Sequence, residues 1–157
     1  MVQRSTQHAT FVIERRFNAT PAQVFRAFAD PVGKARWFAG GADWTEQVRQ
    51  MDFRVGGHER LTGAWKGGVV SSFDAHYQDI VPDLRIVYTY IMHLDDRRIS
   101  VSLASVELSG DGVGTHMTYT EQAVFLDGYD DAGSRERGTR GLFDRLNAEL
   151  QRSPEIG

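Results

Sequence analysis

The stretch Asp131–Arg152, DAGSRERGTRGLFDRLNAELQR, indicates the fold more clearly than any other part of the chain. Its apolar residues Leu142, Phe143, Leu146 and Leu150 recur at helical spacing, which predicts one apolar stripe along an amphipathic helix. A stripe of this kind packs against another layer of structure, so the rest of the chain should provide a surface for it to cover.

Over the two turns before its leucines, the same stripe is polar. At about 100° per residue it continues backwards through Thr139 and Arg135. Gly138 and Gly141 leave the helix thin beside this part of the stripe. A core-facing helix with small and polar side chains over half its length faces a space that side chains do not fill. The sequence therefore predicts a pocket beside this helix.

Length and composition are ordinary for one globular domain, which we place at residues 1–157 with a core at 10–152. The net charge of −3 does not favour nucleic acid or an anionic membrane surface as a partner. The absence of cysteine excludes disulfides, thiol nucleophiles, iron–sulfur clusters and cysteine-bound zinc. No apolar stretch is long enough for a membrane span, and residues 1–10 lack a signal-peptide core. We therefore expect a cytoplasmic location without membrane insertion.

The chain before the long helix predicts one strand, two short helices and six further strands. The first helix should begin at Pro21, because Thr20 and Gln23 have the spacing of a capping box. Asp30-Pro31 ends it, since a residue before proline is pushed out of helical space. The expected elements are a strand at 10–17, helices at 21–30 and 31 to about 38, and strands at 47–54, 58–65, 70–81, 85–94, 98–108 and 115–125.

The arrangement of these elements follows from their spacing. Turn signals recur at intervals of about 10–12 residues, which is typical of an antiparallel meander. Such a sheet must bury one face, and only the C-terminal helix is large enough to cover it. We expect an α+β fold in which a curved antiparallel sheet wraps around this helix and leaves a cleft.

The order of elements resembles the helix-grip fold of the START-like (SRPBCC) superfamily. Several motifs are similar to the branch of the activator of heat shock protein 90 ATPase homologue, C-terminal domain: they are FNATP at 17–21, Trp37-Phe38, DFRVGG at 52–57, DIVP at 79–82 and Thr120-Glu121. The resemblance covers about residues 10–150 and implies an internal cavity, but it transfers no invariant catalytic set. It departs at Gly141-Leu142, where the family often has Gly-Trp. We expect no cofactor.

Two charged residues are the predicted polar groups of the cavity. On the strand 115–125 side chains alternate, so Tyr119 and Glu121 share the apolar face. The helix projection places Arg135 inward, with Thr139 nearby. These groups would orient a ligand in an apolar cavity. The alternative is an internal ion pair that fixes the helix on the sheet.

Aromatic residues complete the predicted ligand-binding site. The resemblance places Trp37, Phe38 and Trp44 at the mouth of the cavity, although such aromatic residues are more often core residues under a loop. Phe143 lies on the helix stripe, and Tyr88 and Tyr90 share one face of the strand 85–94. The opposite face of that strand is also apolar, so its inward face stays open. The inward face of the strand 98–108 stays open as well. A partly covered outer face would suit a homodimer.

Three functions remain open at this point. The first is binding of a small, largely hydrophobic molecule. The second is an enzyme of the cyclase, dehydratase or hydrolase kind, with Glu121 as candidate general base. The third, implied by the resemblance, is modulation of a chaperone ATPase, which in larger relatives depends on an N-terminal domain for which 157 residues leave no room. The five histidines show no metal-ligand spacing, so we expect no metal site.

Overall fold

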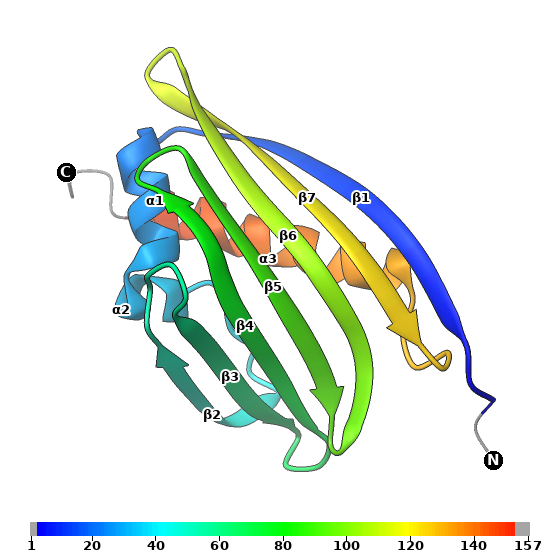
Figure 1. Ribbon diagram of the computed structural model, residues 1–157. Helices are drawn as coiled ribbons and strands as arrows, with labels where there is room; N and C mark the ends of the chain where they lie inside the picture. The colour runs from blue at the N-terminus through cyan, green and yellow to red at the C-terminus, as the bar shows by residue number, and fades with distance from the viewer. Residues whose placement is uncertain (1–2, 153–157) are drawn as a thin grey trace.

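Seven antiparallel strands form one curved, open sheet that lies across the long helix α3 (Ala132–Arg152) in the computed structural model (Figure 1). The structure describes residues 3–152. The other elements are β1 (Thr6–Phe17), α1 (Pro21–Ala29), α2 (Pro31–Ala35), β2 (Trp44–Met51), β3 (His58–Trp65), β4 (Val70–Val81), β5 (Arg85–Leu94), β6 (Arg97–Asp111) and β7 (Gly114–Leu126). The predicted helix-grip fold is confirmed. The predicted single domain extends beyond the described residues at both ends and stays a prediction.

The strand order is β1-β7-β6-β5-β4-β3-β2, so β2 to β7 form the expected meander. The first strand, β1, completes the sheet by pairing along its whole length with β7. Behind the sheet, α3 runs across the strands, and the short helices α1 and α2 lie near its C-terminal end (Figure 1). An ion pair between Arg36 and Glu149, 3.2 Å long, joins the segment after α2 to α3. The helix therefore covers one face of the sheet and leaves the other uncovered.

The first helix begins as the sequence predicts. The Gln23 amide donates to Thr20 Oγ1 at 3.2 Å, and the Thr20 amide donates to Gln23 Oε1 at 2.8 Å. The second helix is shorter than predicted and ends at Ala35. The amides of Trp37 and Phe38 both donate to the Lys34 carbonyl, so the chain leaves the helix through a turn. This turn directs both aromatic rings toward the core.

The predicted strand 47–54 is displaced toward the N-terminus. It spans Trp44–Met51, and its pairing with β3 shifts register between Thr45 and Val48. The residues after it form a tight turn, in which the Arg54 amide donates to the Asp52 carbonyl at 3.0 Å. The error arose because the apolar residues of this turn continue the strand's alternation.

The structure shows which faces of β5 and β6 point inward, which the sequence did not decide. Tyr88 and Tyr90 of β5 are buried on the inner face, as are Ser100 and Ser102 of β6. Apolar side chains of β6 also lie on the outer face, where Leu103 is 42% exposed. A homodimer through this face stays a prediction.

The buried face of α3 contains the predicted stripe and one charged residue more. It consists of Thr139, Phe143, Leu146, Glu149 and Leu150, whereas Leu142 is only partly buried. Within residues 3–152, no helix is both long and apolar enough to cross a membrane.

Candidate functional site

A pocket with a volume of about 340 Å³ lies between the inner face of the sheet, α3 and the segment that connects α2 to β2. Nine of the ten residues predicted for the ligand site line it: Trp37, Phe38, Trp44, Tyr88, Tyr90, Tyr119, Arg135, Thr139 and Phe143. Gly138 also lines it, whereas Gly141 is not among the lining residues. Only the first of the two glycines therefore borders the space that the sequence predicted.

Aromatic rings form much of the pocket wall. Trp37 is only 1% exposed and stands edge-on to Phe28, with ring centroids 4.9 Å apart. Its indole Nε1 donates to the Ala27 carbonyl at 3.0 Å, so it belongs to the core as well as to the wall. Trp44 is half-buried and packs edge-on against Trp65 at 5.3 Å. The two predicted roles of these aromatics, wall and core, are therefore combined in Trp37.

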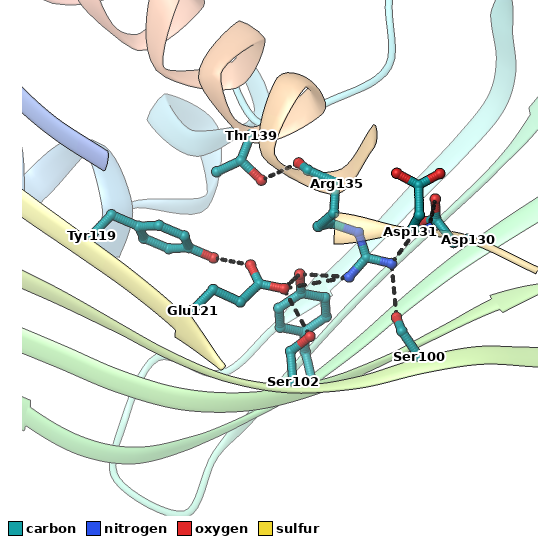
Figure 2. A network of polar contacts seen from close by, with 9 residues as sticks. Ser100, Ser102, Tyr119, Glu121, Asp130, Asp131, Arg135 and Thr139 are labelled. Carbon is teal, nitrogen blue, oxygen red and sulfur yellow. Dashed lines mark hydrogen bonds and ion pairs between the residues drawn. The ribbon is translucent and has the colours of Figure 1, made fainter. Parts of the chain in front are cut away.

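Glu121 is fully buried and is not among the residues that line the pocket, and Figure 2 shows its polar contacts. Its Oε1 accepts a hydrogen bond from the Tyr119 hydroxyl at 2.6 Å. Its Oε2 accepts from Tyr90 at 2.6 Å and from Ser102 at 2.8 Å. A buried carboxylate needs donors of this kind to replace water. The Tyr90 and Tyr119 side chains separate Glu121 from the cavity that they line.

Arg135 extends from the first part of α3 into the same network (Figure 2). Its Nη1 lies 3.4 Å from Glu121 Oε2, and its Nη2 donates to Ser100 at 2.7 Å and to Asp130 at 3.1 Å. The Thr139 hydroxyl does not join this network, because it donates to the Arg135 carbonyl within the helix at 2.9 Å. Thr139 thus presents its methyl-bearing side chain to the pocket while its donor is already used.

Burial and neighbouring charges keep these groups in defined protonation states. Desolvation, and next to it the charge of Glu121, raises the pKa of Tyr90. Desolvation is also the main cause that raises the pKa of Tyr119. Burial opposes the charge of Arg135, but Tyr90, Glu121 and Asp130 together raise its pKa. The tyrosines therefore remain hydrogen-bond donors to Glu121, and Arg135 remains a cation.

A second buried ionic cluster, which the sequence analysis missed, lies at another part of the pocket. Lys34 Nζ is 2.6 Å from Glu59 Oε1, and the Tyr77 hydroxyl donates to the same oxygen at 2.5 Å. Arg49 Nε donates to Glu59 Oε2 at 3.0 Å, and its Nη2 donates to the Phe38 carbonyl. Of these side chains, Lys34 lines the pocket.

The charges of this second cluster depend on one another. Burial works against ionisation of Glu59, but Lys34, Tyr77 and Arg49 lower its pKa overall. Burial lowers the pKa of Lys34, and the attraction of Glu59 offsets this only in part. One signal in the sequence was available: Glu59 lies two residues before the apolar Leu61 on the same strand, which predicts that both side chains face inward.

No group of three or more histidine, aspartate or glutamate side chains in residues 3–152 is placed to hold a metal ion. His58 of β3 and His76 of β4 do lie opposite each other, with ring centroids 4.1 Å apart. Both are exposed, and they point to the outer face of the sheet, away from the pocket.

The family model described as "Activator of Hsp90 ATPase homolog 1-like protein" matches residues 18–151, which is most of the chain. The chain belongs to this family. This match is consistent with the resemblance to the START-like superfamily. It supports a fold of the ligand-binding or modulator type. No curated protein matches the chain.

Two of the solved structures that are similar to this chain have 47% sequence identity with it. An uncharacterised protein from Rhizobium leguminosarum is 47% identical, with a TM-score of 0.92 over 96% of this chain and 99% of that one. The Mll3558 protein from Rhizobium loti is also 47% identical, with a TM-score of 0.87 over 93% and 99%. An AHSA1-like protein from Aeromonas hydrophila, 20% identical with a TM-score of 0.72 over 93% and 94%, shares the fold.

Proposed function

We propose that this member of the Activator of Hsp90 ATPase homolog 1-like family binds a small, largely hydrophobic molecule in the pocket beneath α3. The observation that supports the proposal is a pocket of about 340 Å³ that nine aromatic residues help to line, with Arg135 at the start of α3 and Lys34 of α2 among its polar groups. A volume of this size is in the range of small-molecule sites, and a few placed polar groups among apolar walls are typical of them.

The general-base alternative for Glu121 is less well supported. A general base must reach the proton that it removes, directly or through one water. Both oxygens of Glu121 already accept hydrogen bonds, and Glu121 is not among the residues that line the pocket. Its role in the proposed function is indirect: it positions the hydroxyls of Tyr90 and Tyr119 and the guanidinium of Arg135.

The experiment that tests the proposal has two arms. Native mass spectrometry of freshly purified protein, followed by denaturing analysis, detects and names a molecule that co-purifies. Ligand-observed NMR with benzyl alcohol tests whether the pocket accepts a small aromatic probe. We expect a co-purified apolar molecule or saturable benzyl alcohol binding, and loss of either when the pocket is filled by substitution at Gly138. An empty native mass together with no benzyl alcohol binding would contradict the proposal.

A further inference from the structure

Lys34 is a lysine side chain placed inside an apolar pocket. The chain contains two lysines, Lys34 in α2 and Lys66 in the turn between β3 and β4. The side chain of Lys34 is 6% exposed and lines the pocket, with Nζ 4.7 Å from the centre of the Phe38 ring. Lys66 is exposed to solvent. The two lysine amines of the chain therefore lie in opposite environments, one buried and one exposed.

The ionic cluster around Lys34 contains more positive than negative groups. Lys34 and Arg49 are two cations that share the single carboxylate of Glu59, and Tyr77 donates a neutral hydrogen bond to it. Charges taken out of water are costly, so the cluster gains by losing one proton. Arginine does not give up its proton in proteins, whereas a buried lysine does so readily. Burial accordingly lowers the pKa of Lys34.

We propose that Lys34 is a nucleophilic amine that forms an imine with a small apolar aldehyde or ketone in this pocket. The inference rests on the proposed function, because the carbonyl compound must occupy the same cavity. Two conditions activate a lysine for this chemistry, namely desolvation in an apolar pocket and a neighbouring cation. Lys34 meets both, through the aromatic wall and through Arg49.

The reaction needs no oxidant or reductant. The unprotonated Nζ adds to the carbonyl carbon, and the π electron pair moves to the carbonyl oxygen. This oxygen takes up the proton that the nitrogen releases, which gives a carbinolamine. Loss of the hydroxyl group with one further proton as water leaves a C=N bond. When the imine takes up a proton, Glu59 Oε1, 2.6 Å from Nζ in the structure, pairs with the iminium as it now pairs with the lysine.

The experiment compares the two lysines within the unmodified protein. The chain is incubated with benzaldehyde at neutral pH, imines are trapped with cyanoborohydride, and peptide mapping quantifies the adduct on Lys34 and on Lys66. We expect Lys34 to react several-fold faster than Lys66, because its lowered pKa leaves more of its amine unprotonated at neutral pH. Benzyl alcohol, which has the same ring but no carbonyl, should protect Lys34 and leave Lys66 unchanged. Lys34→Arg should remove the fast reaction, and the matched Lys66→Arg should keep it.

Each other outcome overturns part of the argument. If Lys34 reacts no faster than Lys66 while NMR shows that benzyl alcohol binds, Lys34 is a structural ion-pair partner and the proposed function stands. Fast reaction of Lys34 without protection by benzyl alcohol would contradict an imine formed in the pocket. Absence of both the adduct and benzyl alcohol binding would reject the imine and the proposed function together. The comparison within one chain does not depend on whether a variant folds.

Discussion

Arg135 of α3 reaches the carboxylate of Glu121 on β7, with Nη1 3.4 Å from Oε2. The same nitrogen donates to the Tyr90 hydroxyl at 3.0 Å, and this hydroxyl donates to Oε2 at 2.6 Å. A neutral side chain thus strengthens the link between cation and carboxylate. The contact ties the start of the helix to the inner face of the sheet beside the pocket.

Removal of this cation tests the link directly. We expect Arg135→Ala to lower the free energy of unfolding by about 3–5 kcal/mol, because Glu121 is left as a buried charge without its partner. Urea denaturation measures the change. The matched control is Arg140→Ala on the same helix, which breaks a 2.8 Å pair with Glu136 that is open to solvent. Such a pair contributes about 0.3–0.5 kcal/mol, so similar losses in the two variants would contradict the prediction.

Substitution of Glu59 tests the second cluster. Glu59→Gln removes the charge that faces Lys34 and Arg49, and we expect a loss of about 3–5 kcal/mol in the free energy of unfolding. Asp74→Asn is the control, since Asp74 pairs with Arg60 at 3.4 Å on a more exposed part of the neighbouring strands. Urea denaturation of both variants should separate them clearly. A loss below about 1 kcal/mol for Glu59→Gln would mean that the cluster behaves as a surface pair.

The two glycines of α3 give a matched test of the pocket. An added Cβ at Gly138 or at Gly141 meets no other atom within 4 Å, so both positions accept a side chain. Replacement of a helical glycine by leucine favours the helix by up to about 1 kcal/mol. Gly138→Leu should therefore keep or raise stability while it fills the pocket and abolishes benzyl alcohol binding. Gly141→Leu should keep binding, and equal effects of the two variants on binding would place the ligand elsewhere.

Alkaline pH should unfold the protein through its buried tyrosines. Burial is the first cause that raises the pKa of Tyr77, Tyr88, Tyr90 and Tyr119 above the ordinary value of 10.0. The unfolded chain therefore releases these protons at lower pH than the folded protein. The sign follows: this contribution to stability is complete below pH 10.0 and is lost as the pH rises further.

Lys34 has the opposite effect on stability, and it acts over a lower pH range than the tyrosines. Its lowered pKa lets the folded protein release a proton before the unfolded chain does, so its contribution rises with pH until the ordinary value of 10.5 is reached. Above pH 10.5 only the loss from the tyrosines remains among these groups. Denaturation series at several alkaline pH values, combined with tyrosinate absorbance, should show the buried tyrosines titrating together with unfolding. Titration of all tyrosines in a folded protein would contradict this.

Local signals in the sequence were sufficient for most of the fold. The capping box of Thr20 and Gln23 forms as expected because its partners are three residues apart. The strands β3, β4 and β5 have the predicted bounds, since glycine or proline turns, and Asp95-Asp96 after β5, mark their ends. The stripe of α3 indicated a pocket because its polar half had no apolar residue to bury.

Alternation of side chains was also enough to place Glu121 inward, but not to show what surrounds it. Tyr90, Ser102 and Arg135 come from β5, β6 and α3, and their hydrogen bonds to Glu121 depend on strand register and on the position of the helix. The sequence could not decide which face of β5 points inward, because both of its faces are apolar. The packing of the helix on the sheet determines both the partners of Glu121 and the inward face of β5.

The sequence by itself determined the order of the elements, the helix-grip architecture and the inward direction of Glu121 and Arg135. Only the tertiary structure decided that Glu121 lies behind the pocket wall and that Lys34 shares the carboxylate of Glu59 with Arg49. The physical reason is the distance along the chain over which each kind of interaction acts. Periodicity and capping act over a few neighbouring residues, whereas a buried charge finds its partners across strands and helices that are brought together only when the core is packed.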